Sequence, residues 1–287
     1  MFDVCVVGSA NLDLVATAAH APAPGETVLG HSYAEHPGGK GLNQAVAAAR
    51  SGATTAFLGA LGTDAAAERL RHVLELDGID HTGVRVIDGL PTGRALITVA
   101  DDGENSIVVV PGANAAVVVD SMPSAGVVLA QLEIPLEVVV EAFRLAKASG
   151  ATTVLNPAPA AALPDTLLTL TDIVIPNQHE ATMLGGPQRL LEQGPQAVIV
   201  TLGGDGAQWF SSTGTTAIPP LVVNPVDTTA AGDAFCGAFC ARLAVGDRIE
   251  AALSWAAAAG ALATTLPGAV PSLPDAAAIR AALADRG

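Results

Sequence analysis

An aspartate that ends a run of small residues is the strongest chemical signal in this sequence. Asp233 closes the stretch Asp227-Thr228-Thr229-Ala230-Ala231-Gly232 and stands where an apolar, helix-compatible run begins at Ala234. Small residues let a ligand approach the backbone, and a helix N-terminus offers unpaired N–H groups and the positive end of the helix dipole. Such a site binds anions, phosphate above all, and a carboxylate beside it can accept a proton from an attacking hydroxyl. The alternative is an N-cap aspartate among small residues packed at a helix start.

A glycine-rich turn, Pro37-Gly38-Gly39-Lys40-Gly41, leads into an Ala-rich helical stretch. It is not a Walker A loop, because Lys40 is followed by Gly instead of Ser or Thr. No Gly-x-Gly-x-x-Gly dinucleotide fingerprint follows the first expected strand either. One interpretation is that the backbone approaches a small polar ligand, to which Lys40 and Asn43 supply hydrogen bonds. The other is a plain turn in which Asn43 caps the following helix.

Polar residues also follow several of the expected strands. In open α/β sheets, ligands bind at the carboxyl ends of the parallel strands. The candidates here are Asn11 and Asp13 after the first strand, Glu133, the pair Asn177 and Glu180, and the glycine-rich stretch 201–206. Each has a structural alternative: an Asx-turn for Asn11 and Asp13, a solvated side chain for Glu133, a capping box for Asn177 and Glu180, and a hairpin turn for 201–206.

Short β-branched runs alternate along the chain with Ala-rich runs of helical length. Continuous apolar strands between helices indicate a parallel sheet that helices cover on both faces. This sheet would bring the polar residues above to one edge. The expected strands are 4–7, 127–131, 153–155, 173–175 and 197–201, and the expected helices are 44–51, 136–149 and the run after Gly232.

Two regions, residues 12–37 and 92–111, alternate more like half-exposed antiparallel strands. Two apolar runs, 94–99 and 106–110, flank Asp101-Asp102-Gly103-Glu104, which is a favourable hairpin turn. These regions are candidates for a small β lid that stands off the main sheet, with bounds of about 12–42 and 92–112. Because no repeat, linker or composition break divides the chain, we expect residues 1–287 to form a single domain.

The composition limits the classes of function. Of the 287 residues, 50% are hydrophobic and 3% aromatic, so Ala, Val and Leu must fill the core. The net charge of −15 argues against binding to nucleic acid, which needs clustered Lys and Arg. Cys5, Cys236 and Cys240 lie in apolar stretches and indicate buried thiols in a reducing compartment. Since neither a leader sequence nor a membrane-spanning run is apparent, we expect a cytoplasmic protein with no membrane partner.

The order of these motifs along the chain resembles that of the PfkB sugar kinases of the ribokinase-like fold, and among them the ribokinases. The resemblance extends nearly end to end, and the stretch 227–233 is its most specific part. Most relatives have Gly at the position of Ala230, and Ala-Ala-Gly-Asp is typical of ribokinases. The other matching segments are Gly8-Ser9-Ala10-Asn11-Leu12-Asp13, Pro24-Gly25-Glu26-Thr27, residues 38–48, Pro111-Gly112-Ala113-Asn114, Gln131-Leu132-Glu133, Asn156-Pro157-Ala158-Pro159-Ala160 and Asn177-x-x-Glu180.

The resemblance implies a role for each matching position. The last Asp of the signature is the base in this family, which implies Asp233, and an anion hole formed by the N–H groups of Ala230, Ala231 and Gly232. Sugar hydroxyls would be bound by Asn11, Asp13, Gly39, Lys40, Asn43, Glu133 and Asp233. ATP would lie along Asn177, Thr201, Gly203, Gly206 and Gly232. Glu180 would organise Mg²⁺ through water, and K⁺ would use Asp227, Thr229, Gly268, Ser272 and the carbonyl groups of Ala263 and Leu266.

The implied fold is a three-layer α/β/α sandwich with a mainly parallel sheet and a small β lid. The implied reaction is the ATP-dependent phosphorylation of the primary hydroxyl of D-ribose to ribose 5-phosphate, with Mg²⁺ and an activating K⁺. Deoxyribose, a nucleoside or another sugar are alternative substrates. A non-catalytic sugar-binding regulator is an alternative of another class, against which the intact Gly232-Asp233 pair argues.

Two further expectations come from the comparison with the family. Relatives of this type pair through the lid, which implies a homodimer. The segment 181–197 is shorter than the family pattern, and Ala257 stands where many relatives place His or Asn against the adenine. Both departures concern the nucleotide more than the transfer of the phosphoryl group.

Overall fold

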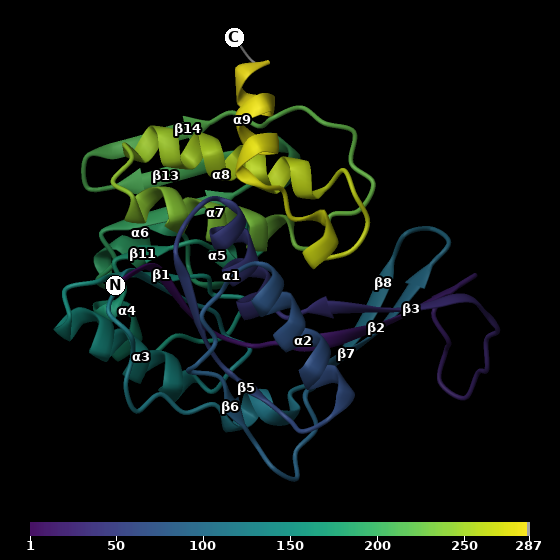
Figure 1. The fold of residues 1–287 in the computed structure, drawn as a ribbon. Coiled ribbons are helices and arrows are strands. Elements are labelled where there is room, and N and C mark those ends of the chain that lie inside the picture. Colours follow the sequence, from purple (N-terminus) through teal and green to yellow (C-terminus); the bar gives the residue numbers. More distant parts are fainter. Residues whose placement is uncertain (286–287) are drawn as a thin grey trace.

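An eight-stranded sheet forms the centre of the protein in this computed structural model, which describes residues 1–285 (Figure 1). The strands lie in the order β14-β13-β12-β11-β10-β9-β1-β4. Neighbours from β12 to β4 are parallel, whereas β13 pairs antiparallel with β12 and with β14. The strands are β1 (Phe2–Val7), β4 (Thr55–Leu58), β9 (Ala125–Ala130), β10 (Thr152–Leu155), β11 (Ile173–Val174), β12 (Ala197–Thr201), β13 (Ala207–Ser211) and β14 (Gly214–Ile218).

Helices cover both faces of this sheet. One face carries α1 (Lys40–Arg50), α2 (Ala65–Leu76), α7 (Ala231–Ala244) and α8 (Ile249–Ala263), with α9 (Ala276–Ala284) outside α8. The opposite face carries α3 (Leu136–Ala148), α4 (Asp165–Leu170), α5 (Gln178–Met183) and α6 (Pro187–Glu192). The expected three-layer α/β/α sandwich with a mainly parallel sheet is therefore confirmed.

The sequence of β1 shows why the sheet is covered on both faces. Successive side chains of a strand point to opposite faces, and from Val4 to Val7 all of them are apolar and buried. Val4 and Val6 pack in the cluster beneath α1, α7 and α8, whereas Cys5 and Val7 pack in the cluster beneath α3. Both faces of the strand are therefore withdrawn from water, which is the burial pattern typical of a parallel sheet.

The small residues of α7 allow it to pack closely against α1. A Cβ atom at Gly237 would lie 2.3 Å from the carbonyl oxygen of Gln44 in α1, a distance that only glycine avoids. Close packing of α1 on α7 places the first turns of both helices side by side, although their sequences are far apart. The low aromatic content of the chain suits this arrangement, because Ala-rich helices approach one another closely.

A second sheet of four strands stands away from the main one, in the order β3-β2-β7-β8 (Figure 1). Its strands are β2 (Asn11–Ala18), β3 (Gly30–Gly38), β7 (Gly93–Ala100) and β8 (Asn105–Val110). The β7–β8 hairpin has its turn at the expected acidic stretch, where the N–H of Gly103 donates to the carbonyl of Ala100 at 2.9 Å. Residues 40–42, which we expected at the lid boundary, belong to α1.

The remaining elements connect these parts. A two-stranded sheet joins β5 (Ala60–Leu61) to β6 (Arg85–Val86), and short 3₁₀ helices span Gly112–Ala116, Gly203–Asp205 and Val270–Ser272. Within residues 1–285, no helix has both the length and the apolar character needed to cross a bilayer.

Candidate active site

The carboxyl ends of the parallel strands gather the polar residues of the site. Asn11 lies beyond β1, Glu133 beyond β9 and Asn156 beyond β10, all on the side of the sheet where α1 and α7 begin. The separate segments of the sequence signature therefore meet at one edge of the sheet, as the fold class predicts.

Asp233 is buried at the third position of α7, with 6% of its surface exposed. The helix is capped by Ala230, so the N-cap alternative for Asp233 is wrong. Its carboxylate accepts two hydrogen bonds from α1: Asn43 Nδ2 donates to Oδ2 at 2.9 Å, and Gln44 Nε2 donates to Oδ1 at 2.8 Å. The expectation that Asn43 caps its own helix is wrong for the same reason, since α1 is capped by Gly39.

The N-terminus of α7 offers free donors beside this carboxylate. Among residues 1–285, no acceptor lies in hydrogen-bond geometry with the N–H of Gly232 or of Asp233. The N–H of Ala231 makes a long bond of 3.3 Å to the carbonyl of Thr228. Ala230 has a φ of 60°, the one left-handed conformation of a non-glycine residue among residues 1–285, and this turns the chain sharply into the helix.

Asp13, Lys40 and Glu133 form a charged group close to Asp233. Glu133 is not a solvated side chain: its Oε2 accepts from Ser9 Oγ at 2.5 Å and from the backbone N–H of Lys40 at 3.1 Å. Burial, together with the charges of Glu133 and Asp233, raises the pKa of Asp13 to about 7. The charges of Asp233 and then Glu133 raise the pKa of Lys40, although burial alone would lower it. The site thus holds several carboxylates around one ammonium group.

Asn11 lies within strand β2, so the Asx-turn proposed for it is not formed. Its Oδ1 accepts from Asn114 Nδ2 at 2.7 Å, and Asn114 Oδ1 in turn accepts from the N–H of Ala10 at 3.0 Å. Asn114 belongs to a motif that we noted without a role, and sequence reasoning missed it. Its position after an apolar strand, in an otherwise small and apolar segment, was the available signal.

The glycines of the 38–41 turn make room for these contacts. A Cβ atom at Gly38 would lie 2.1 Å from Asp13 Oδ2, so only glycine leaves space for that carboxylate. Gly39 has a φ of 92°, and a Cβ atom there would meet the N atom of Asn11 at 2.7 Å. The turn therefore approaches the residues of β2, and Lys40 follows directly as the first residue of α1.

Gly232, the residue before Asp233, lines a cavity of about 360 Å³ that fits the expected nucleotide site. Thr201, Gly203 and Gly206 line it as expected, together with Phe235 and Ala257. Residues 203–205 form the turn between β12 and β13, so the hairpin alternative holds as well. The walls are mainly apolar and small, which suits the flat face of a base.

Asn177 and Glu180 form the expected capping box at the start of α5. Asn177 Oδ1 accepts from the N–H of Glu180 and Glu180 Oε2 accepts from the N–H of Asn177, both at 2.8 Å. A single parallel bridge places Asn177 beside Thr201, next to the cavity. Burial raises the pKa of Glu180, against the lowering effects of the Asn177 N–H and of Lys40.

The carboxylate of Glu180 fits a magnesium ion that arrives bound to a nucleotide. No cluster of three or more His, Cys, Asp or Glu side chains that could hold a metal occurs in the described part of the chain. Mg²⁺ typically keeps several waters and uses one or two carboxylates together with substrate phosphates. Glu180 has one oxygen in the capping box, which leaves Oε1 for such a water.

Three of the expected potassium ligands, Asp227, Thr229 and Gly268, come together from two loops. Asp227 Oδ1 accepts from the N–H of Thr229 at 2.9 Å, and Oδ2 accepts from the N–H of Gly268 at 2.8 Å. Burial alone would raise the pKa of Asp227, but hydrogen bonds outweigh it and lower the pKa: first the bond from the Thr229 hydroxyl to Oδ1 at 2.6 Å, then those from the N–H groups of Gly268 and Thr229. An ionised carboxylate is a hard oxygen ligand, which fits a cation. Ser272, four residues after Gly268, is buried, and its Oγ donates to the carbonyl of Ala269 at 2.8 Å.

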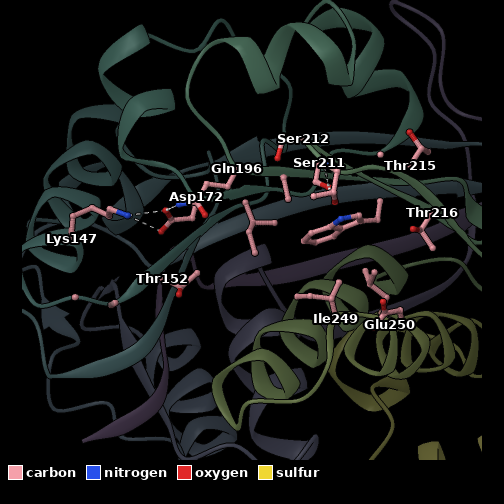
Figure 2. A pocket seen from close by; sticks show the side chains of 18 residues that line it. Lys147, Thr152, Asp172, Gln196, Ser211, Ser212, Thr215, Thr216, Ile249 and Glu250 are labelled. Carbon is pink, nitrogen blue, oxygen red and sulfur yellow. Dashed lines mark hydrogen bonds and ion pairs between the residues drawn. The ribbon is translucent and has the colours of Figure 1, made fainter.

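Another cavity, of about 760 Å³, lies elsewhere, at the amino ends of β10, β11 and β12 (Figure 2). Asp172 in its wall accepts from Lys147 Nζ at 2.8 Å and from Gln196 Nε2 at 2.9 Å. Its other oxygen accepts from the N–H of Thr153 at 2.9 Å. The carboxylate is fully engaged in fixing this edge of the sheet, so we assign the cavity no part in the chemistry.

Comparison with known proteins agrees with this site. Residues 1–276 match the model of the pfkB family carbohydrate kinases. A bifunctional ribokinase/ribose-5-phosphate isomerase A of Fructilactobacillus sanfranciscensis is 41% identical over 97% of this chain, which spans 56% of that longer protein. The ribokinase of Staphylococcus aureus is 38% identical, with 94% of this chain and 96% of that protein covered.

Among solved structures, Arabidopsis thaliana ribokinase complexed with ribose and ATP is similar to this chain, with a TM-score of 0.91 and 32% identity. The match covers 98% of each chain. The family match over nearly the whole chain and the buried aspartate at the start of α7 lead to one conclusion. The chain belongs to the pfkB family of carbohydrate kinases, phosphotransferases that act on an alcohol group.

Proposed function

We propose that this protein transfers the terminal phosphoryl group of ATP to the primary hydroxyl of D-ribose, which gives ribose 5-phosphate and ADP. The observation that carries the proposal is the placement of Asp233. Its buried carboxylate lies between the charged group of Asp13, Lys40 and Glu133 on one side and the cavity lined by Gly232 on the other. A sugar hydroxyl and a nucleotide phosphate can therefore meet at this residue.

The residues of the chain have separable tasks in the transfer. Asp233 accepts the proton of the attacking hydroxyl, and its two amide donors hold the carboxylate in place. The free N–H groups of Gly232 and Asp233 stabilise negative charge on the transferring phosphoryl group, as does the dipole of α7. Since the transferred group needs little covalent help from the protein, positioning and charge stabilisation supply most of the rate enhancement.

The metal roles are part of the proposal. Mg²⁺ would arrive with ATP and be oriented by Glu180 through water, where it neutralises phosphate charge. K⁺ would bind between the loops of Asp227 and Gly268, with Thr229, Ser272 and the carbonyl groups of Ala263 and Leu266 as further ligands. A cation there would order the loop that leads to Ala230 and the anion hole. The fit of both ions rests on the donor types and on the contact between Asp227 and Gly268.

Release of ADP with a panel of sugars tests the function and separates ribose from deoxyribose, other sugars and nucleosides. The decisive variant is Asp233→Asn. It should lower kcat by at least ~10²-fold, the usual scale for removing a general base. The variant should still fold, because Asn43 can rotate its amide and offer the new side chain its Oδ1, which has no partner in the wild type.

The matched control is Asp165→Asn, an exposed aspartate of α4 on the opposite face of the sheet. It should keep the wild-type kcat. Near-native kcat in Asp233→Asn would remove this residue from the mechanism. Absence of sugar-dependent ADP release in the wild type would instead support the sugar-binding regulator.

The four-stranded sheet is proposed to act as a lid over the sugar and as a dimer contact. Every residue of β8 is exposed, and the strand has four consecutive apolar residues, 107–110, of which Val108 is 61% exposed. Proteins normally cover such an apolar edge strand, and a second copy related by two-fold symmetry is the simplest cover. Light scattering should give a dimer that Val108→Lys converts to a monomer, while Val118→Lys, at a residue outside this sheet, should leave it dimeric. A monomeric and fully active wild type would refute the pairing.

The location and the excluded partners remain part of the same proposal. Three unpaired, buried cysteines suit the reducing conditions of the cytoplasm. The net charge of −15 argues against binding to the phosphate backbone of nucleic acid.

A further inference from the structure

A chain of buried side-chain amides ends on Asp233, and none of its members lines the nucleotide cavity. Gln131 Nε2 donates to Gln44 Oε1 at 2.6 Å, and Gln44 Nε2 donates to Asp233 Oδ1 at 2.8 Å. The same Gln44 nitrogen donates to Asn156 Oδ1 at 3.0 Å. Gln44 and Gln131 are completely withdrawn from water, and Asn156 is 8% exposed. Polar groups buried this deeply need partners, so the arrangement is costly to disturb.

The direction of every bond in this chain is fixed by the protein backbone. Asn156 Nδ2 donates to the carbonyl of Ile175 at 2.8 Å, and a carbonyl can only accept. The amide of Asn156 therefore cannot turn over, and its Oδ1 must face Gln44. Gln44 must answer with its nitrogen, which leaves its Oε1 for the nitrogen of Gln131. The carbonyl just beyond β11 thus determines that Gln44 offers an N–H to Asp233.

The two ends of the network are also informative. Across residues 1–285, the only buried side-chain polar atoms without a partner are Asn43 Oδ1 and Gln131 Oε1. Asn43 uses its nitrogen atom to donate to Asp233. Gln131 Oε1 lies against Gly8, since a Cβ atom added to Gly8 would be 2.1 Å from it. Two residues therefore leave an acceptor unsatisfied while their nitrogen atoms serve the bonds that lead to Asp233. Two unsatisfied buried acceptors destabilise the fold, which indicates that the fixed orientation of the Asp233 carboxylate has a function.

We propose that Gln44 is a positioning residue for the phosphoryl transfer and that Gln131 locks the Gln44 amide in its donating orientation. Gln44 keeps Asp233 Oδ1 occupied and immobile, so that the carboxylate presents its remaining lone pairs to the sugar hydroxyl. This inference rests on the proposed role of Asp233 as proton acceptor. Gln44 is completely buried and hydrogen-bonds no expected substrate-binding residue other than Asp233, so its loss should act on the reaction step and not on binding.

The first test is Gln44→Met, which keeps the length of the side chain but removes the donor. We expect kcat to fall about 10- to 100-fold, the scale for a hydrogen bond to a charged group. The KM values for ribose and ATP should change less than about threefold, because binding and transition-state effects separate in this way. Gln44→Glu, which has the same shape but faces Asp233 with an acceptor, should have a lower kcat than Gln44→Met. A purely structural role would instead raise KM or lower stability without this order of kcat.

The lock is tested by a double-mutant cycle. Gln131→Met should lower kcat by less than Gln44→Met does, and should cause no further loss when combined with it, because both changes act through the same bond. If Gln131→Met costs the same factor in both backgrounds, Gln131 does not act through Gln44 and the lock is refuted. Should Gln44→Met fail to fold, Gln131→Met alone still decides: unchanged kcat overturns the proposal.

Failure of this inference differs from failure of the proposed function. If the wild type phosphorylates ribose and Asp233→Asn is inactive, but Gln44→Met keeps kcat within twofold, only the positioning role is wrong. If the wild type releases no ADP with any sugar or nucleoside of the panel, both are overturned, because Asp233 then has no proton to accept.

Discussion

Replacing Asp13 by Asn should reduce the dependence of the protein's stability on pH. The folded protein holds this carboxyl with a pKa of about 7, against 3.8 for an unperturbed group, because of burial and then the charges of Glu133 and Asp233. Asn has the same shape and cannot ionise, so the comparison of the two proteins isolates the cost of charging one side chain.

The sign follows from which state takes up the proton. Below a pH of about 4, Asp13 is neutral in both states and costs nothing. As the pH rises toward 7, the unfolded chain ionises freely while the folded protein retains the proton, so the free energy of unfolding falls. Once the pH has passed the folded pKa of about 7, Asp13 is ionised in both states and the free energy of unfolding falls no further through this group.

The magnitude follows from the same shift. About two pH units separate pH 5 from the folded pKa, and each is worth ~1.4 kcal/mol. The wild type should therefore lose on the order of 3 kcal/mol more than Asp13→Asn between pH 5 and pH 8. The measurement is urea unfolding of both apo proteins at those pH values and one protein concentration. Parallel stability curves would show that Asp13 ionises normally in the fold, and would refute the reasoning.

Three other perturbations test the metal sites and the strained turn. Glu180→Gln should raise the Mg²⁺ concentration needed for half-maximal activity more than it changes the KM for ribose, because the amide cannot hold metal-bound water as a carboxylate does; an unchanged Mg²⁺ titration would leave Glu180 as a capping residue only. K⁺ should activate the wild type, with Na⁺ a poor substitute, and Asp227→Asn should weaken that response; equal rates in K⁺ and choline buffers would rule the site out. Ala230→Gly should raise the free energy of unfolding by about 0.5 kcal/mol, since glycine accepts a φ of 60° and the entropy it adds to the unfolded chain offsets only part of the gain. Thermal unfolding measures this, and a lower Tm would show that the turn is not strained.

Much of the architecture was readable from local patterns. Apolar runs such as that of β1 have side chains of one kind on both faces, and this requires cover on both sides of a sheet. The start of a helix after Gly232 followed from the change in composition at Ala234. The resemblance to the PfkB kinases implied that Asp233, Lys40 and Glu133 share one site, and the structure brings their charges close together.

Other features could not be read in this way. The helix that we expected from residue 44 begins at Lys40, because the glycine turn continues directly into it. Of the antiparallel strands β13 and β14, only the turn into β13 was anticipated, as the hairpin alternative for 201–206, since short polar strands at a sheet edge have no strong apolar pattern. Both assignments depend on how the segment packs, which propensity describes only weakly.

The sequence by itself determined that a carboxylate would follow a small-residue turn at a helix start, because both signals lie within a few residues of each other. Only the tertiary structure decided what holds that carboxylate. Asn43 and Asp233 are 190 positions apart, and their hydrogen bond exists because α1 packs against α7 at Gly237. The direction in which Gln44 donates depends on the backbone carbonyl of Ile175, just beyond strand β11. Periodicity describes residues on one element, whereas the geometry of a buried polar network depends on how several elements pack together.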